Sequence, residues 1–539
     1  MLTKTLILLI CFIKINHIYS NMTNKNPTNL QQQLWSVADS LRGKMHADEF
    51  RDYCLGFIFY KYLSEKIDKK ANDLLKHHEE KYEFCDLSIS NNTPEQEEIL
   101  QAVKTEMLNS LGYFLYPDEL FKSIVEKGEV FILDDLKKIL KNIEHSNQDC
   151  NEKADLTNLF EDIQLDSSKL GSSPKDRNRL IVEILQKLAK IDFCLENDEV
   201  DVLGDAYEYL IGEFASGAGK KAGEFYTPQC VSEILARIAV DGRTRIKSVY
   251  DPTCGSGSLL LRVARQTGVK VAKFYGQEMN RTTYNLARMN MILHDVAYDE
   301  FDIKNDDTLE HPQHIDNRFE AIVANPPFSA DWSASKQFET DDRFSQYGKI
   351  APRTKADYAF ITHMIHQLDE KGTMAIVLPH GALFRGAAEG HIRKYLIKER
   401  NYLDSVIGLP PNLFFGTSIP SCILVFKKCR QDADNILFID ASRDFIKGKN
   451  QNELDSKHIE NIISTYRDRA TIDKYSYLAP MSEIKENDYN LNIPRYVDTF
   501  EPEPPVDIQA VLHNKKQIET ELNATKHKMG ELLTELGIE

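Results

Sequence analysis

The residues best suited to chemistry in this chain form the tetrapeptide Asn325-Pro326-Pro327-Phe328. It follows a mainly apolar run at 319–324 that predicts a buried strand. The two prolines stop that strand and stiffen the turn, so the Asn325 side chain and the Pro326 carbonyl are held in place. Two acceptors fixed side by side suit an amino group with two hydrogens to donate, and the neighbouring aromatic ring can stack on a flat base.

A glycine-containing turn between a predicted strand and a predicted helix is the second candidate. Its residues are Asp251-Pro252-Thr253-Cys254-Gly255-Ser256-Gly257-Ser258. Glycines let the backbone bend sharply and approach a ligand, and ligands in doubly wound sheets lie at such strand ends. The spacing is not that of a dinucleotide site, and residues 217–221 lack the ending of a phosphate-binding P-loop. A purely structural strand–helix turn is the alternative.

Two acidic positions follow the next predicted strands. Glu278 lies about 20 positions beyond the glycine turn, where a carboxylate suits hydrogen bonding to ribose hydroxyls. Asp307, next to Asp306, is placed to accept a hydrogen bond from the adenine amine of a ligand. For both positions the alternative is a carboxylate that caps a helix or a turn.

The elements that must position these residues change in kind along the chain. Residues from about 28 to 215 have helical periodicity, with a polar, loop-like stretch at 145–174. After residue 216, strands alternate with helices, which predicts a parallel α/β sheet with right-handed crossovers. The predicted strands are 248–251, 272–277, 319–324, 373–379, 403–408 and 421–427, and the predicted helices are 259–266, 283–294, 358–368 and 392–397. The last two strands have no helix between them, which predicts an antiparallel hairpin at one edge of the sheet.

The C-terminal part is less regular from about Asn435 onward. Residues 501–505 are acidic and proline-rich, which predicts a linker. Apolar residues at helical spacing between Ile508 and Leu536 then predict one long amphipathic helix, which suits contact with a partner or packing on its own chain. We therefore expect an extension (1–27), a helical domain (28–170), a catalytic α/β domain (171–430), the rest of the catalytic region (431–500), and a linker with a partner-binding helix (501–539).

Composition limits the possible functions. The net charge is −17, whereas a protein that grips nucleic acid alone usually has a basic footprint. Contact with nucleic acid is therefore expected to be local or supplied by a partner. The 9 cysteines are scattered and form no CxxC pair, which disfavours a zinc site or a disulfide framework, so we expect no metal site.

The motifs, taken in order, resemble those of the amino-group DNA methyltransferases. Besides the glycine turn and Asn325–Phe328, residues 223–228, 378–386, 415–420 and 490–496 are similar to motifs of that family. With the helical region and the long C-terminal helix, residues 28–539 resemble the modification subunit of a type I restriction-modification enzyme. The resemblance implies an α/β fold: a Rossmann-like class I S-adenosylmethionine-dependent methyltransferase sheet with an N-terminal all-α domain and a long C-terminal helix.

The same resemblance implies a reaction and partners. The reaction is methyl transfer from S-adenosyl-L-methionine to adenine N6 in duplex DNA. The implied partners are DNA, a specificity subunit that selects the DNA sequence, and a restriction subunit. Two modification subunits would share each specificity subunit. We expect a cytoplasmic protein with no membrane association, because a secreted methyltransferase would have no cofactor supply. The apolar run at 6–13 is too short to span a membrane, and we expect translation to begin at Met22.

The resemblance also implies residue roles. Gly255 to Ser258 would lie under the methionine part of the cofactor, Glu278 would bind its ribose and Asp307 its adenine. The implied cofactor-binding residues are Glu224, Phe225, Tyr226, Thr227, Pro228, Gln229, Asp251, Gly255, Ser256, Gly257, Ser258, Glu278 and Asp307. The implied catalytic residues are Asn325, Pro326, Pro327 and Phe328. Phe328 would stack on the target base from one side and Phe415 from the other; Phe414 is the less favoured candidate because its alternative is hydrophobic packing.

Two other functions are compatible with these motifs. One is the same fold acting on another amine, in a protein glutamine, in RNA, or in DNA without a partner. The absence of an evident target-recognition domain after the last motif favours the partner-dependent enzyme. The other is an inactive structural subunit, against which the intact Asn325 and Glu278 argue.

Overall fold

The computed structural model describes most of the 539 residues. The described ranges are 29–39, 47–78, 81–87, 92–128, 130–146, 156–193, 201–217, 227–415, 417–448, 451–499 and 507–537. The chain divides into two compact units, Met1–Val497 and Asp498–Glu539, which are described separately. The apolar run at 6–13 and the expected start at Met22 lie outside the described residues.

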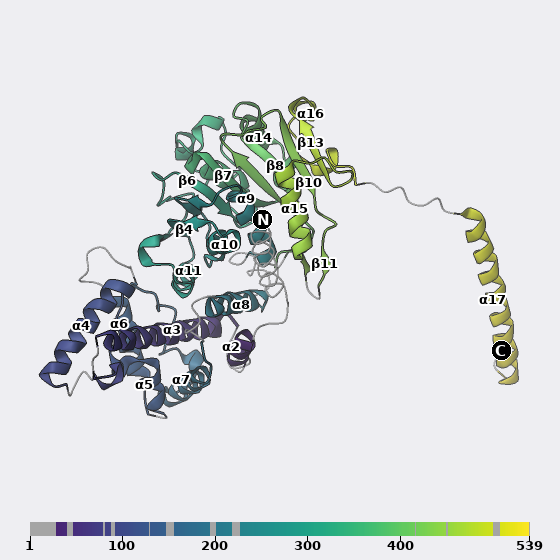
Figure 1. Ribbon diagram of the computed structural model, residues 1–539. Coiled ribbons are helices and arrows are strands. Elements are labelled where there is room, and N and C mark those ends of the chain that lie inside the picture. Colours follow the sequence, from purple (N-terminus) through teal and green to yellow (C-terminus); the bar gives the residue numbers. More distant parts are fainter. Residues whose placement is uncertain are drawn as a thin grey trace, which may run out of the picture. The chain divides into compact units, whose positions relative to one another are not determined.

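Helices dominate the chain up to residue 217 (Figure 1). They are α2 (Asn29–Asp39), α3 (Ala47–His77), α4 (Pro94–Leu111), α5 (Phe121–Glu126), α6 (Leu133–His145), α7 (Pro174–Ala189) and α8 (Val202–Gly217). The later helices are α9 (Gln229–Ala239), α10 (Ser258–Thr267), α11 (Arg281–Leu293), α12 (Asp357–Gln367), α13 (Gly381–Phe384), α14 (Ala387–Lys398), α15 (Ser456–Asp468), α16 (Met481–Glu486) and α17 (Ile508–Glu535). The short 3-10 helices are η1 (Phe84–Asp86), η2 (Pro117–Glu119), η3 (Ser168–Leu170), η5 (Tyr298–Glu300), η6 (Lys336–Glu339), η7 (Ser345–Tyr347) and η8 (Ile493–Arg495).

Local sequence explains where these helices begin and end. Before α4, the Thr93 hydroxyl accepts the Gln96 backbone N–H, Pro94 takes the first helical position, and Gly112 ends the helix in a left-handed conformation with φ of 78°. Helix α3 is buried on all sides from Tyr53 to Ser64, whereas the apolar residues Leu100, Val103 and Met107 of α4 share one buried face. That face joins a core to which α11 also contributes Leu286, Met289, Ile292 and Leu293, so α11 connects the helical region to the sheet.

The stretch at 145–174 differs from the sequence prediction in one respect. Its described part, residues 156–173, is mostly irregular, as predicted, but it is not a polar surface loop. Leu156, Leu159, Phe160 and Leu165 are buried in the core of the helical region. These apolar side chains alternate with acidic ones along the sequence without helical or strand periodicity, which is why the pattern looked polar.

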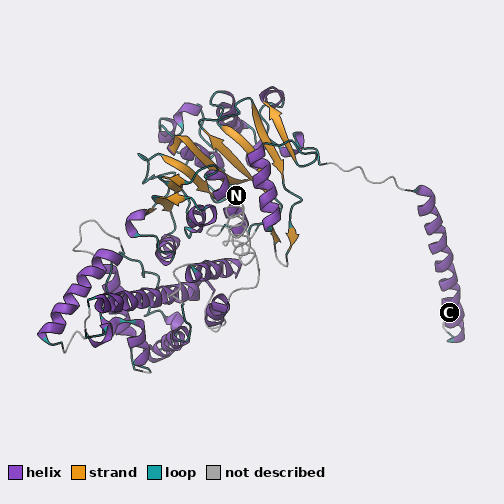
Figure 2. Ribbon diagram, viewed as in Figure 1, coloured by secondary structure: helices purple, strands orange, loops and turns teal. Residues whose placement is uncertain are grey.

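All the described strands lie after residue 244, where they alternate with helices (Figure 2). They are β1 (Arg245–Ile246), β2 (Val249–Asp251), β3 (Lys270–Val271), β4 (Phe274–Glu278), β5 (Phe301–Asn305), β6 (Phe319–Ala324), β7 (Leu368–Pro379), β8 (Leu403–Gly408), β9 (Ser421–Lys427), β10 (Asn435–Asp440), β11 (Ile446–Lys447), β12 (Asn452–Glu453) and β13 (Ser476–Pro480). Within the described ranges, the main sheet has 9 strands in the order β13-β10-β8-β9-β7-β6-β2-β4-β5. Strands β5, β4, β2, β6 and β7 are parallel, and β9 runs antiparallel to both β7 and β8.

The predicted hairpin of β8 and β9 is therefore antiparallel, as expected, but its predicted position at the edge of the sheet is wrong. β10 adds to β8 in parallel, and β13 pairs antiparallel with β10. The region after Asn435, which carried no clear pattern, supplies these two outer strands. They cover the backbone groups of β8 that an edge strand would leave unpaired.

Both faces of the sheet are buried. In β6, Ala321 and Val323 face a core formed with α9, α10, α11 and α15. Ile322 and Ala324 face the opposite core, formed with α12, α14 and α16. Burial on both faces explains why this strand is almost continuously apolar rather than alternating.

The second unit contains α17, which begins after the Asp507 side chain accepts the Gln509 and Ala510 backbone N–H groups. The predicted long C-terminal helix is confirmed. Among the described helices of the chain, none has the length and apolar character required to cross a membrane.

Candidate functional site

The order of the strands brings the two predicted chemical segments together. The chain passes from β2 to β4 and β5 on one side, then returns to place β6 on the other side of β2. Val249 and Tyr250 of β2 pair with Ala321 and Ile322 of β6. The carboxyl ends of these parallel strands therefore meet at the point where the strand order reverses, which is where ligands bind in open α/β sheets.

The glycine turn after β2 has a conformation that depends on its glycines. Gly255 and Gly257 have positive φ angles of 54° and 76°, and α10 begins at Ser258. The Gly257 N–H donates to the Cys254 carbonyl at 2.8 Å, which closes the turn. On the adjacent strand β4, a Cβ at Gly276 would lie 2.9 Å from Cys254 Sγ, so a side chain there would displace the turn.

Glu278 lies at the end of β4 and is tied to the same turn. One carboxylate oxygen accepts the Gly255 N–H at 3.1 Å, and the other accepts the Asn280 N–H at 2.8 Å. Burial raises the pKa of Glu278 above its ordinary value. A carboxylate has about four lone-pair sites, so Glu278 can still accept a hydrogen bond from a hydroxyl group.

Asp251 is a second buried carboxylate in the turn. It accepts the Thr253 N–H at 2.9 Å. Burial, and to a lesser extent the charge of Glu278, raises the pKa of Asp251 to about 7 in spite of the hydrogen bonds from Thr253. Among the described residues, no lysine or arginine forms an ion pair with Asp251 or Glu278. The turn therefore fits a ligand that offers hydroxyl donors and positive charge.

Asp307 follows β5 on the same edge. Its Oδ1 accepts the N–H groups of Leu309 and Glu310 at 2.9 and 3.2 Å, so the turn-capping alternative describes this oxygen. Its Oδ2 accepts no hydrogen bond from the residues that the structure describes. The carboxylate can thus hold its own turn and bind a ligand amine at the same time.

Asn325 follows β6, and its side chain is oriented by one contact. The Asn325 Nδ2 donates to Thr227 Oγ1 at 3.1 Å. Within the described part of the chain, Asn325 Oδ1 has no hydrogen-bond donor. The amide is therefore held by its nitrogen and presents its oxygen, which is the orientation that an acceptor of an amine hydrogen requires.

The aromatic residues near Asn325 have different surroundings. The Phe328 ring packs edge-on against the Phe414 ring, with centroids 5.4 Å apart. Phe414 is buried, so its role is hydrophobic packing, which was the sequence-based alternative to base stacking for this residue. Phe328 and Phe415 are both partly exposed, and their stacking on a target base stays a prediction.

The sequence did not predict a largely buried polar network around Ser329, the residue that follows Phe328. Asp357 at the start of α12 accepts the Ser329 N–H at 2.9 Å and forms an ion pair with Arg385 at 2.7 Å. Arg385 also contacts Glu389 at 3.2 Å and the Ser329 hydroxyl at 3.2 Å. Ser329 itself has a φ of 53°, which is costly for a residue with a side chain. The signal in the sequence was Arg385, which lies within the motif-like segment 378–386.

The later motif-like segments assemble around the same edge. The His380 N–H donates to the Pro420 carbonyl at 3.3 Å, which joins segment 378–386 to the end of segment 415–420. The Leu491 N–H donates to the Leu383 carbonyl at 2.9 Å, which brings in segment 490–496. Segment 490–496 therefore supports the site by packing. Of the predicted N-terminal cofactor segment, Glu224, Phe225 and Tyr226 lie outside the described residues, and Gln229 begins α9.

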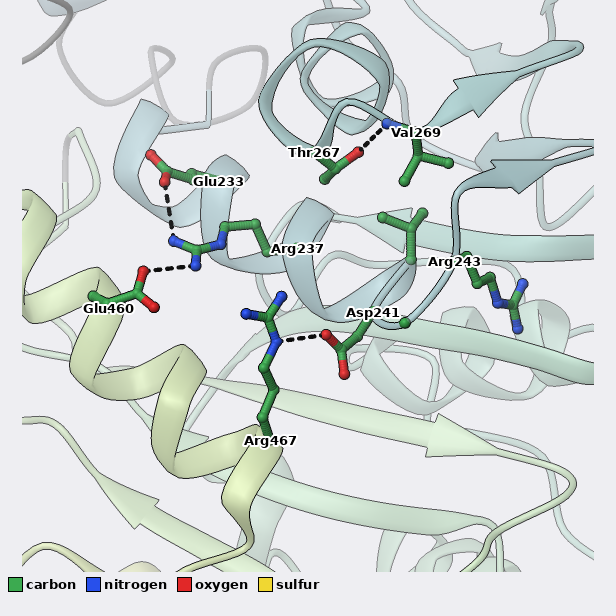
Figure 3. A pocket seen from close by; sticks show the side chains of 10 residues that line it. Glu233, Arg237, Asp241, Arg243, Thr267, Val269, Glu460 and Arg467 are labelled. Carbon is green, nitrogen blue, oxygen red and sulfur yellow. Dashed lines mark hydrogen bonds and ion pairs between the residues drawn. The ribbon is translucent and has the colours of Figure 1, made fainter. Parts of the chain in front are cut away.

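A pocket of about 250 Å³ lies apart from the residues of the candidate site (Figure 3). Its walls come from the end of α9, from the residues that lead toward β1, from the end of α10 and from α15. Two of its three arginines form ion pairs, Arg237 with Glu460 and Arg467 with Asp241, and Arg243 donates to the Glu320 carbonyl. α10 starts at the carboxyl edge of the sheet and ends here, so this pocket belongs to the opposite edge and is separate from the candidate site.

Comparison with known proteins gives consistent matches along most of the chain. A family model described as N-6 DNA Methylase matches residues 198–504, and one described as HsdM N-terminal domain matches residues 30–188. The chain is 37% identical to the type I restriction enzyme MpnII methylase subunit of Mycoplasma pneumoniae, over 95% of this chain and 96% of that protein. It is 30% identical to the MjaVIII methylase subunit of Methanocaldococcus jannaschii, over 86% of this chain and 78% of that protein.

A solved structure is similar over nearly the same length. It is the crystal structure of the type I restriction-modification system methyltransferase subunit from Streptococcus thermophilus. The TM-score is 0.80 at 45% identity, with 88% of this chain and 100% of that chain covered.

Proposed function

The chain belongs to the N-6 DNA methylases and, among them, to the methylase subunits of type I restriction enzymes, and on this premise we propose that the site around Asn325 methylates the N6 amine of adenine in DNA. The orientation of Asn325 is the observation that carries this proposal. Its amide nitrogen is engaged by Thr227, and its oxygen is directed to accept a hydrogen from an incoming amine.

The reaction requires the protein to improve a poor nucleophile. The lone pair of adenine N6 is delocalised into the ring. Asn325 Oδ1 and the Pro326 carbonyl accept the two amine hydrogens, which favours a pyramidal nitrogen with a directed lone pair. The same two oxygens stabilise the positive charge that develops on this nitrogen, and their fixed positions avoid reorganisation during the reaction.

The target adenine must leave the duplex to reach Asn325, because the site cannot contact N6 of a stacked base. Phe328, placed directly after Pro327 and supported by Phe414, stacks on the extruded base. Phe415 stacks on its other face. The buried network of Asp357 and Arg385 fixes the turn that carries Phe328.

The residues of the glycine turn support S-adenosylmethionine as the cofactor. When bound, it supplies an electrophilic methyl group on a sulfonium. Glu278 would accept hydrogen bonds from the ribose hydroxyls, and Asp307 Oδ2 would accept one from the adenine amine. Gly255 to Ser258 would lie under the methionine part, and the segment from Glu224 to Gln229 would line the cofactor pocket. The buried carboxylates without cationic partners suit a ligand that is itself cationic.

The proposal includes partners that are not part of this chain. A specificity subunit selects the DNA sequence, two copies of this chain share each specificity subunit, and a restriction subunit completes the enzyme. We place contact with a partner on α17, whose apolar residues recur at helical spacing. DNA and S-adenosylmethionine are both present in the cytoplasm, where the proposal locates the protein.

Tritiated-methyl transfer tests the proposal. The full chain, co-purified with its specificity subunit, is expected to label unmethylated DNA and to leave RNA and protein unlabelled. Asn325→Ala is expected to lower transfer by at least about 100-fold, the scale observed for loss of one fixed transition-state contact. Binding of S-adenosylmethionine, measured by calorimetry, is expected to survive. Turnover retained in this variant, or label on protein or RNA alone, would refute the assignment.

A further inference from the structure

Residues 349–355 differ in charge from the rest of this acidic chain. They contain Lys349, Arg353 and Lys355 and no acidic residue, whereas the whole chain has a net charge of −17. Lys349 and Arg353 are exposed, and Lys355 is half-buried. We call residues 349–355 the basic segment.

The charges of the basic segment are not neutralised locally. None of its three basic side chains has an ion-pair partner among the residues that the structure describes. Two other basic residues near the site are paired, Arg343 with Asp341 at 2.8 Å and Arg385 with Asp357 at 2.7 Å. Unpaired cations close together in the chain attract a polyanion.

Hydrogen bonds to backbone carbonyls place the basic segment next to Ala330 and Trp332, which follow Phe328 in the chain. The Trp332 N–H donates to the Arg353 carbonyl at 2.9 Å, and the Trp332 ring N–H donates to the Pro352 carbonyl at 3.0 Å. The Ala356 N–H donates to the Ala330 carbonyl at 2.9 Å. The segment is thereby fixed alongside residues 330–332, immediately after Phe328.

We infer that the basic segment binds the DNA phosphates that flank the target adenine, an inference that rests on the proposed function. An extruded nucleotide stays connected to its neighbours, so the adjacent phosphates lie at the mouth of the pocket that receives the base. Lysine and arginine contacts to phosphate give affinity without sequence information. This is the form of DNA contact expected of a subunit whose partner selects the sequence.

The test compares salt dependence of DNA binding in the complex with the specificity subunit. Each phosphate contact contributes a slope of about −0.9 to a plot of log affinity against log salt concentration. Arg353→Gln combined with Lys355→Gln is expected to weaken binding of specific and nonspecific DNA alike and to make the slope shallower by about 1.8. The charge-retaining pair Arg353→Lys with Lys355→Arg is expected to keep the wild-type slope.

A matched control lies at the opposite edge of the sheet. Arg245 in β1 and Lys270 in β3 are exposed and also lack an ion-pair partner among the described residues. They are partners in the parallel pairing of β1 with β3, and these two strands precede β2 and β4 in the chain. Arg245→Gln with Lys270→Gln removes the same charge and is expected to leave the slope unchanged. An equal change in the control would show that net charge alone, and not this segment, sets DNA affinity.

The outcomes separate this inference from the proposed function. If the wild type methylates DNA but the Arg353 and Lys355 double variant keeps the wild-type slope and affinity, the basic segment does not bind phosphate and the function stands. If the wild type transfers no methyl group to DNA, both fail. Calorimetry with S-adenosylmethionine checks that the double variant is folded. If the double variant is unfolded, the single variant Lys349→Gln takes its place in the test, and its salt-dependence slope is expected to be shallower by about 0.9.

Discussion

The contact between Thr227 and Asn325 allows the role of one hydroxyl to be measured. Thr227→Val keeps the shape of the side chain but removes the acceptor of the Asn325 Nδ2 hydrogen bond, which spans 3.1 Å. A neutral hydrogen bond of this kind contributes about 0.5–1.5 kcal/mol net. If the bond acts by orienting Asn325 in the transition state, kcat/KM for DNA falls by about 2-fold to about 13-fold.

The assay is single-turnover methyl transfer at saturating S-adenosylmethionine, together with the Kd of the cofactor. The hydroxyl of Thr227→Ser can still accept the bond, so this variant is expected to recover most of the wild-type rate. The predicted loss is far smaller than that of Asn325→Ala, because the Asn325 oxygen remains in place. An unchanged rate in Thr227→Val, or a loss that Thr227→Ser does not restore, would refute the orienting role; a loss found only in cofactor affinity would assign Thr227 to the cofactor instead.

Three further predictions concern the same edge of the sheet. Asp357→Asn is expected to lower the free energy of unfolding, measured in urea, by about 2 kcal/mol, because hydrogen bonds to a charged group contribute about 1.5–3 kcal/mol. The same variant is expected to slow methyl transfer. A variant as stable as the wild type would show that the contacts of Asp357 with Ser329 and Arg385 are unimportant. The raised pKa of Asp251, about 7, means that the folded state holds a proton which the unfolded state releases, so stability falls as pH rises between its ordinary pKa and about 7. Asp251→Asn is expected to lose less stability than the wild type between about pH 5 and about pH 7 in urea titrations, and an equal loss would contradict this. Phe328→Ala is expected to reduce the fluorescence increase of 2-aminopurine at the target position, and an unchanged signal would remove Phe328 from the stacking role.

Much of the fold was accessible from local sequence because the relevant signals are local. The almost continuously apolar run before Asn325 predicts a strand buried on both faces, and β6 is such a strand. The expected α/β methyltransferase sheet with helical and C-terminal additions is confirmed by the similarity to the Streptococcus thermophilus subunit. The outer strands β10 and β13 were not predicted, because a helix and irregular chain separate them and pairing between distant strands leaves no periodic signal.

Sequence alone determined the identities of the chemical groups: an amide and a carbonyl fixed by two prolines, a glycine turn, and carboxylates at strand ends. Their types and order depend only on covalent neighbours, so they are visible in one dimension. The tertiary structure decided what holds them. Thr227 lies 98 positions before Asn325 and still accepts its amide hydrogen, and Asp357 and Arg385 fix a turn that neither residue adjoins in sequence. Such contacts arise because β6 returns beside β2, and a strand order that reverses in space has no counterpart in the linear chain.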